Sequence, residues 1–349
     1  MRTFDFSRNA LGIGIAAAFL AGCGGSQPPI APLQSLPFAQ AHTTEAQRDD
    51  GNSWMAPEAK RIKELLYVSD QNTNRVYIYS YKTGRVVGKL VSLFQPSGQC
   101  IDRNGDIWIA DYVGEAVVEY PHGDVHRIKR IRTDGLPNSC TVDPTTGNLA
   151  VANAVTRHGP SNIVVFTQLG EHSVYSNKDC NLIEQVGYDN HGNLYVAAGS
   201  LGSSPYVCEL PHGGKSLEKI TISRQIRTPR GVMWDGKYIA FTDDDYLHGN
   251  AAIYQATPTR SGGLKVVSTT VFKSGCGGLS YLFQPFIVGS VNTPSNSQQG
   301  TAVVGDDYVS IYHCEHPFSY WVYPAGGKPT HNLFNAPLSP SGQSVSIGT

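Results

Sequence analysis

A repeat of 41 to 45 residues constrains the fold of this chain more than any other feature. Each copy is marked by an apolar run that ends in a small residue and then Asp, Asn or Ala. The clear copies are "LYVSD", "IWIAD", "LAVAN", "LYVAA" and "IAFTD", which end at positions 70, 111, 153, 198 and 243. A period of this size, with apolar runs of strand length, is typical of propellers in which each repeat forms one blade.

The turns before the markers repeat as well. They read "DRNG" from Asp102, "DPTTG" from Asp143, "DNHG" from Asp189 and "DG" from Asp235. Asp accepts hydrogen bonds within its own turn and Gly tolerates a positive φ, so the pattern indicates hairpins. The markers are apolar at consecutive positions, as expected for strands that are covered on both faces. Each unit is therefore predicted to be a four-stranded antiparallel blade.

The two ends of the repeat region predict how the ring closes. No strand precedes Leu65 in the first unit, whereas "GQSVSIG", residues 342–348, is a spare strand at the C-terminus. We expect an all-β, six-bladed propeller that is closed by pairing of this strand with the strand containing Tyr67 and Val68. Seven blades are the alternative if the insertion around "KSGCGGLSYLF" belongs to a further blade.

The N-terminus has the pattern of an export signal. Arg2 and Arg8 precede the apolar stretch "ALGIGIAAAFLAG", which is too short to span a bilayer as a mature helix. The following "LAGC" resembles the lipobox of bacterial lipoproteins, and this resemblance implies cleavage before Cys23 and a lipid anchor on it. We expect a signal peptide over residues 1–22, a lipidated (palmitate-bearing) Cys23 with a flexible tether over residues 23–61, and a propeller over residues 62–349.

That resemblance also predicts a location. Gly24 follows the lipidated cysteine, where Asp commonly retains Gram-negative lipoproteins at the inner membrane. The expectation is therefore an extracytoplasmic protein of the cell envelope, at the outer membrane if the source is Gram-negative.

At "LYVSD", "IWIADY" and "GNLYVAA" the chain resembles the NHL-type repeats of six-bladed propellers. "SWMAPEAK", "DPTTGNLAVAN" and "VYPAGGKPT" resemble a group of uncharacterised bacterial lipoproteins. The resemblance covers residues 62–349 loosely. It implies a fold rather than an activity, because propellers of this type include binding modules, lyases and lactonases.

Six cysteines remain if Cys23 is lipidated, and an even number in an exported chain suggests disulfides. Cys140 and Cys180 stand near the start of inner strands in adjacent units and are predicted to pair, with Cys100 as a competing partner for Cys140. Cys276 and Cys314 both fall in the irregular C-terminal units and form a second tentative pair. Buried free thiols are the alternative.

The sequence contains no recognisable catalytic motif, so no catalytic residue is predicted. Asp243, Asp244 and Asp245 follow a marker strand and are weak candidates for Ca²⁺ or another divalent metal, although an Asp at a strand end more often caps a turn. No cofactor is otherwise expected. The net charge of −1 gives no support for nucleic-acid binding.

Two classes of function remain from the sequence. The first is a monomeric, membrane-anchored binding or scaffold module for a protein, peptide or glycan. The second is a metal-assisted lyase or lactonase with its site at the central channel, resembling the streptogramin-lyase and gluconolactonase propellers. Such a site needs ligands from several inner strands, which offer little beyond Glu184 and Arg230. This small number of candidate ligands favours the binding module over the enzyme.

Overall fold

The computed structural model describes residues 51–157, 159–199, 205–227, 229–245, 250–273, 282–288, 300–306, 318–323, 325, 331–333 and 340–348. Its strands form one five-stranded sheet and five four-stranded sheets. All pairings between neighbouring strands of these sheets are antiparallel. The four-stranded meander predicted from the repeat is therefore present.

The five-stranded sheet joins both ends of the folded unit. Its strands, in spatial order, are β1 (Trp54–Met55), β4 (Val86–Leu90), β3 (Arg75–Ser80), β2 (Glu64–Asp70) and β25 (Pro340–Ile347). A short 3₁₀ helix, η1 (Ala59–Arg61), lies between β1 and β2 in sequence.

The four-stranded sheets follow one another along the chain. They are β5 (Pro96–Ile101), β6 (Ile107–Asp111), β7 (Ala116–Tyr120) and β8 (Lys129–Arg132); β9 (Gly135–Val142), β10 (Leu149–Thr156), β11 (Asn162–Phe166) and β12 (His172–Tyr175); β13 (Ile183–Tyr188), β14 (Leu194–Ala198), β15 (Tyr206–Leu210) and β16 (Glu218–Ile220); β17 (Pro229–Trp234), β18 (Ile239–Asp245), β19 (Asn250–Pro258) and β20 (Leu264–Lys273); and β21 (Leu282–Val288), β22 (Gly300–Asp306), β23 (Phe318–Tyr323) and β24 (His331–Leu333).

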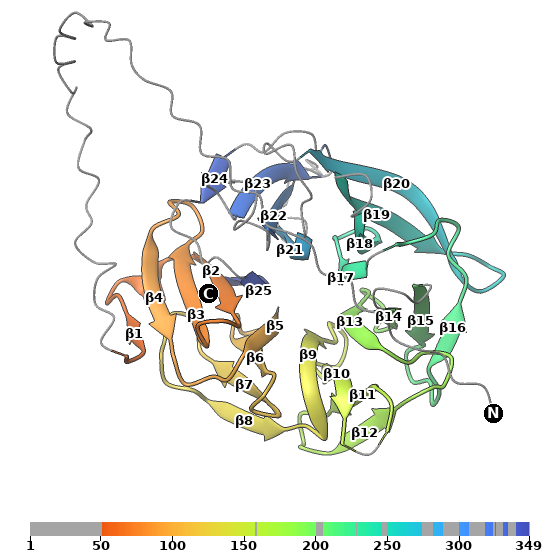
Figure 1. Ribbon diagram of the computed structural model, residues 1–349, viewed down its shortest axis with the longest axis horizontal. Coiled ribbons are helices and arrows are strands. Elements are labelled where there is room, and N and C mark those ends of the chain that lie inside the picture. Colours follow the sequence, from red (N-terminus) through yellow and green to blue (C-terminus); the bar gives the residue numbers. More distant parts are fainter. Residues whose placement is uncertain are drawn as a thin grey trace, which may run out of the picture. The chain divides into compact units, whose positions relative to one another are not determined.

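The sheets are arranged in a ring, with the first strand of each four-stranded sheet toward the centre (Figure 1). Inner strands contact one another in the cyclic order β25, β5, β9, β13, β17, β21 and back to β25. The fold is thus an all-β propeller, as the repeat predicted.

The C-terminal strand pairs with β2, as expected from the missing first strand of that unit. Tyr67 lies opposite Ser344, and Val68 lies opposite Gln343. The next sheet packs so closely that a Cβ on Gly342 would collide with the backbone of Ser97 in β5. Only glycine fits at this position of β25.

Ordered structure begins earlier than the sequence indicated. Trp54 and Met55 of β1 pair with Lys89 and Gly88 of β4, so contacts with the propeller extend N-terminal to residue 62, where we expected the domain to start. The polar composition of this stretch concealed one short edge strand. The signal peptide, Cys23 and most of the expected tether lie outside the described residues.

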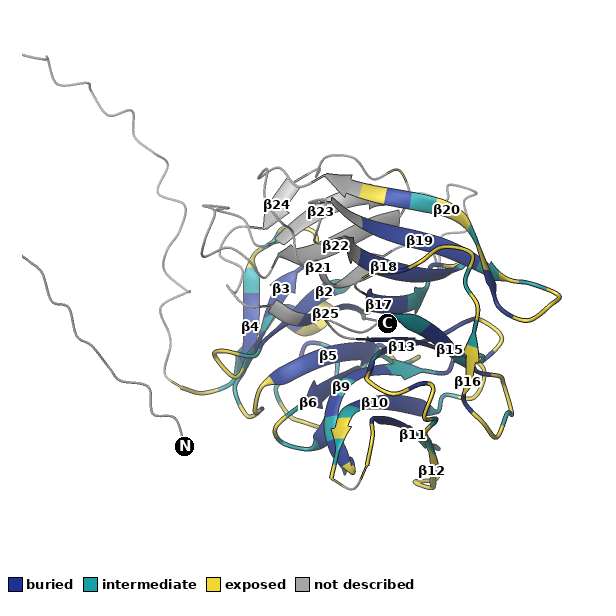
Figure 2. Ribbon diagram, turned by 45° about the vertical axis from the view of Figure 1, so that its right-hand side comes forward, coloured by how far each residue is buried: buried dark blue, intermediate teal, exposed yellow. Residues whose placement is uncertain are grey.

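The core consists of separate layers between neighbouring sheets. Successive residues of β2 alternate between two such layers, because Leu65 and Tyr67 pack with β6 while Leu66 and Val68 pack with Val345 of β25. All four β2 residues are fully buried. In the sheets between β2 and β19 that Figure 2 colours by burial, buried residues follow the inner and middle strands and exposed residues lie in connecting loops. The consecutive apolar residues of the markers are explained by this two-sided burial.

Two disulfides correct the predicted pairing of Cys140 with Cys180. Cys140 of β9 is bonded instead to Cys100 of β5, with 5.6 Å between their Cα atoms, and Cys180 is bonded to Cys208 of β15. The reason lies in the path of the loop before β13. Asn177 in that loop donates its side-chain amide to the carbonyl of Leu217, next to the outermost strand β16, so Cys180 reaches β15 and not the inner strands. Cys276 and Cys314 lie outside the described residues.

Candidate functional site

Asp residues at the ends of the marker strands accept hydrogen bonds from neighbouring loops. One of these residues is the candidate metal ligand Asp243. One oxygen of Asp243 accepts a hydrogen bond from the backbone N–H of Arg227 at 2.9 Å, and the other accepts one from the hydroxyl of Tyr254 at 3.1 Å. Asp243 is almost completely buried. Asp244 and Asp245 continue β18 in register with Ala251 and Asn250 of β19. Asp243 therefore links the loop before β17 to β18 and β19.

Polar side chains on the inner strands β5 and β9 form hydrogen bonds with neighbouring sheets. Gln99 of β5 donates to the hydroxyl of Ser69 of β2 at 2.6 Å, and the Ser97 hydroxyl donates to the backbone carbonyl of Asn138 of β9 at 3.0 Å. Asn138 in turn donates its amide to the backbone carbonyl of Glu184 of β13 at 3.0 Å. These amides and hydroxyls are thus engaged between sheets. Arg230 is in β17, but its side chain is not among those described.

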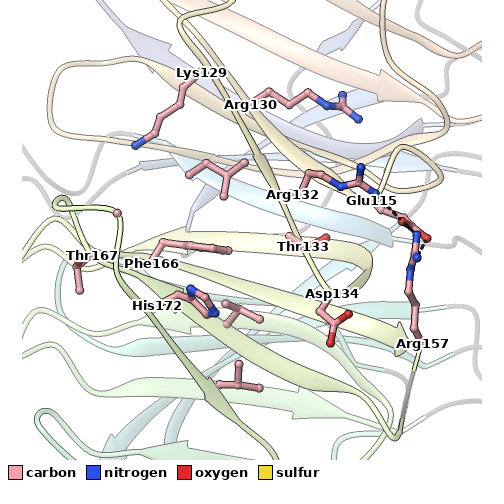
Figure 3. A pocket seen from close by; sticks show the side chains of 14 residues that line it. Glu115, Lys129, Arg130, Arg132, Thr133, Asp134, Arg157, Phe166, Thr167 and His172 are labelled. Carbon is pink, nitrogen blue, oxygen red and sulfur yellow. Dashed lines mark hydrogen bonds and ion pairs between the residues drawn. The ribbon is translucent and has the colours of Figure 1, made fainter.

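A cleft of about 750 Å³ lies between the outer strands of the β5–β8 and β9–β12 sheets. Both flanking strands, β8 and β12, are edge strands of their sheets. Figure 3 shows the side chains that line it, with Lys129, Arg130 and Arg132 on one side and Phe166 and His172 on the other. Four Lys or Arg side chains and two carboxylates line it: Lys129, Arg130, Arg132, Arg157, Glu115 and Asp134. Cationic groups therefore outnumber carboxylates.

Glu115 organises the cationic side of the cleft. It accepts hydrogen bonds from two of the Arg157 side-chain nitrogens, Nη2 and, at 3.2 Å, Nε, and it lies 3.6 Å from Arg132. Hydrogen bonding and charge attraction from Glu115 raise the pKa of Arg157 above its ordinary value. The Arg132 side chain is 78% exposed, so a ligand in the cleft can reach it beside Glu115.

A second ion pair fixes the strand at the base of the cleft. Arg130 donates to the buried Asp111 carboxylate at 2.6 Å and to the carbonyl of Gly114 at 2.7 Å. The other Asp111 oxygen accepts the backbone N–H of Phe94 at 2.6 Å. Arg130 is thus a positioning group, whereas Lys129 and Arg132 are the cations that β8 presents to solvent. Within β8, Lys129, Arg130 and Arg132 are exposed and Ile131 is half-buried.

A cluster of three carboxylates lies at one end of the β5–β8 sheet. Asp102 follows β5, Asp106 precedes β6, and Glu119 is in β7; one oxygen of each lies within 4.8 Å of the others. Among the described residues this is the one cluster of His, Cys, Asp or Glu with the spacing of a metal site. Burial raises the pKa of Glu119 to about 7, and the charges of the two aspartates act in the same direction.

Neither the cleft nor the carboxylate cluster was identified from the sequence. The signal for the cluster was present, since glutamate stands at the same position of the third strand in "VVEYPHG" and "YVCELPHGG". The cleft had no sequence signal, because it is formed by outer strands of two different repeats.

Comparison with solved structures supports the fold. The chain is similar to a chain of a nidogen/laminin complex, with a TM-score of 0.59 and 12% identity over 82% of this chain and 99% of that one. It is also similar to a protein of unknown function from Bacteroides caccae, with a TM-score of 0.56 and 14% identity over 81% and 99% of the two chains. These structures, together with the ring of antiparallel sheets, define the chain as a β-propeller.

No protein-family model and no curated protein matches the chain. Virginiamycin B lyase from Staphylococcus aureus is a more distant structural match, with a TM-score of 0.47 and 11% identity over 77% of this chain and 84% of that one. Identities this low show the fold alone. Among the described residues, no helix has the length and apolar character of a membrane span.

Proposed function

We propose that this protein is a lipid-anchored, extracytoplasmic binding module, whose cleft between β8 and β12 takes an extended acidic segment of a partner protein. In this proposal the five-stranded sheet acts as a sixth blade, and the anchor is Cys23. The proposal rests on the charged cleft between β8 and β12.

The chemistry of the cleft favours an acidic and extended ligand. Its four Lys or Arg side chains exceed its two carboxylates, and Arg132 and Lys129 are exposed. Phe166 and Val174 add apolar contacts beside these charges. The flanking edge strands carry unpaired backbone groups, to which an extended peptide can add as a further strand. Charge complementarity gives such a ligand its orientation.

Export is supported by the cysteines. Four of them form two buried disulfides, and disulfides persist in oxidising compartments. This agrees with the signal-peptide pattern before Cys23.

The alternative, a metal-assisted lyase or lactonase at the central channel, has less support. Such an enzyme needs ligands that converge from several inner strands. The carboxylate cluster of the described residues comes instead from a β5–β6 turn and from β7, all within one sheet.

The binding proposal is tested with a fluorescein-labelled peptide that alternates Glu and Val, followed by fluorescence anisotropy at low salt. The double variant Lys129→Glu, Arg132→Glu should weaken binding by roughly tenfold, since two exposed charge contacts are together worth about 1.4 kcal/mol. The matched control is Lys215→Glu, Lys219→Glu, which makes the same charge change beside β16 and should bind as the wild type does. A peptide that alternates Lys and Val should not bind.

Equal loss of affinity in both double variants would mean that net charge alone attracts the peptide and would contradict a specific cleft. Unchanged affinity in the cleft variant would also contradict the proposal. If an uncharged oligosaccharide competes for the cleft while the acidic peptide does not bind, the ligand is a glycan and the proposed partner chemistry is wrong.

A further inference from the structure

The side chain of Glu119 is buried beside two other carboxylates. It is 9% exposed, and one of its oxygens lies within 4.8 Å of oxygens of Asp102 and Asp106. No hydrogen bond or ion pair to its carboxylate is present among the described residues. A buried carboxylate without a partner carries a large desolvation cost, which requires a compensating cation or proton.

The two aspartates each keep an oxygen for such a cation. Oδ1 of Asp102 accepts the backbone N–H groups of Asn104 at 2.8 Å and Asp106 at 3.0 Å. Oδ1 of Asp106 accepts the backbone N–H of His122 at 3.3 Å. The backbone N–H of Gly105 also interacts with the Asp102 carboxyl, but no side-chain donor bonds Oδ2 of either residue within the described part of the chain. The turn therefore fixes the orientation of the two carboxylates without neutralising them.

The β13–β16 sheet has the same backbone arrangement but differs in two side chains near its carboxylates. The first is Tyr195, which lies opposite Glu209 where Trp108 lies opposite Glu119. The second is Asn193, which replaces Asp106, whereas Asp189 and Glu209 occupy the positions of Asp102 and Glu119. Asn193 donates its side-chain amide to Oδ2 of Asp189 at 2.9 Å. Its carbonyl oxygen accepts the N–H of His212 at 3.0 Å, as Asp106 accepts that of His122. The asparagine thus supplies a donor to the aspartate.

The remaining comparable sheets also avoid three carboxylates. Val165 stands at the position of Glu119 in the β9–β12 sheet, where it lies opposite Ala150. In the β17–β20 sheet, Gln255 stands there and donates its amide to Asp235 at 2.5 Å. Only the β5–β8 sheet, among these four, combines three acidic side chains with no side-chain donor among them.

We infer that Asp102, Asp106 and Glu119 form a Ca²⁺ site built into the β5–β8 sheet, independent of the proposed peptide cleft. Ca²⁺ binds carboxylate oxygens at 2.3–2.6 Å, so two of its ligands lie at most about 5 Å apart, in agreement with the spacing of the cluster. Water and backbone carbonyls complete its coordination of six to eight oxygens. Carboxylates without imidazole or thiolate ligands favour Ca²⁺ or Mg²⁺ over zinc.

A lysine is the competing cation. Lys129 of β8 lies opposite Glu119 and favours its charged form, but the side chain is exposed and belongs to the rim of the cleft. A proton on Glu119 is the other way to reduce the charge of the cluster. Both alternatives make the stability of the protein insensitive to added Ca²⁺, which distinguishes them from the inferred site.

The test uses the full chain, purified in detergent and dialysed against EDTA. Isothermal titration with CaCl₂ should give one binding event, and Ca²⁺ at about 100 times its Kd should raise Tm by roughly 3–6 °C. Glu119→Gln and Asp106→Asn, which install the side chains of the sister sheets, should each abolish the heat and the Tm shift while the variants remain folded. Glu209→Gln is the matched control and should keep both.

Three results would overturn the site. They are the absence of a heat for the wild type, a heat that survives in Asp106→Asn, and a heat lost equally in Glu209→Gln. MgCl₂ in the same titration decides the ion, since equal or tighter Mg²⁺ binding would overturn the assignment to Ca²⁺. Asn193→Asp gives a gain-of-function check, because the third carboxylate in the β13–β16 sheet should add a second, weaker binding event.

Discussion

The β5–β8 and β13–β16 sheets are nearly the same structure with different polar interactions. Both have an Asp at the first hairpin, a Glu on the third strand and a "PHG" turn after it. Yet the first places Asp106 where the second has Asn193, and the first has Asp124 after its turn where the second has Gly214. The repeat therefore determines the backbone, whereas single side chains determine what each sheet can bind.

The cysteines differ between these two sheets in the same way. Cys100 links the β5–β8 sheet to the next sheet through inner strands, while Cys180 and Cys208 link an incoming loop to the sheet that follows it. One disulfide holds two repeats together, and the other holds one repeat to its own loop.

The largest effect is expected from deletion of residues 340–349, which removes β25. This strand pairs with β2 along its whole length and contacts β5 and β21. The loss of a full ladder of hydrogen bonds, each worth about 1 kcal/mol, should lower the free energy of unfolding by about 5 kcal/mol or more and favour aggregation through the new edge.

Hydrogen exchange should show that this deletion affects the two sheets unequally. Protection in β5 and β6 should fall first, because Ser346 contacts Gly105 and His122 beside that sheet. The β13–β16 sheet should keep its protection. Equal loss in both sheets, or unchanged thermal stability with a monomeric protein, would contradict this role of β25.

Removal of the disulfides should have the next largest effect. The pairs close loops with sequence separations of 40 and 28 residues, so the chain-entropy model assigns about 3–4 kcal/mol to each. The variants Cys100→Ala, Cys140→Ala and Cys180→Ala, Cys208→Ala should therefore lose similar amounts of stability in denaturant titrations. Peptide mapping without reduction checks the pairing itself, and a Cys140–Cys180 peptide would show that the connectivity is wrong.

A smaller change is expected from Asp106→Asn in the presence of EDTA. The new amide can donate to Asp102 as Asn193 donates to Asp189, and one half-buried negative charge is removed. The metal-free variant should be about 1 kcal/mol more stable than the metal-free wild type, measured by urea unfolding. Asn193→Asp should show the opposite sign. A destabilised Asp106→Asn variant would mean that the carboxylates do not repel one another in the wild type.

The smallest effect is expected from Asp124→Asn, which removes an ion pair of 2.6 Å between Asp124 and the exposed Lys60 of η1. Burial acts to raise the pKa of Asp124, but hydrogen bonds from Lys60 and His126 outweigh it and hold the pKa below the ordinary value. Its stabilisation is therefore present above about pH 4 and is lost on acidification. Because Lys60 is largely exposed, we expect about 0.5 kcal/mol at neutral pH. A variant that matches the wild type at pH 7 and at pH 3 alike would show that the pair contributes nothing.

The fold could be predicted from the sequence because each repeat carries its own hairpin signals. Consecutive apolar residues such as Leu65 to Val68 indicated burial on both faces, and the missing strand before Leu65 indicated the partner of β25. The disulfide pairing and the carboxylate cluster were harder to predict from the sequence. The partner of Cys180 depends on the path of a loop, and the role of Glu119 depends on strand register. The same Asp-turn-Gly pattern caps a turn at Asp189 and contributes a carboxylate to the cluster at Asp102.

A crystal structure of the protein grown with CaCl₂ tests most directly whether the two sheets differ as described. We expect one ion within 2.3–2.6 Å of oxygens of Asp102, Asp106 and Glu119. We expect no ion beside Asp189 and Glu209, where Asn193 keeps its hydrogen bond. A metal-free cluster bridged by the amine of Lys129, or an ion bound equally in both sheets, would contradict this expectation.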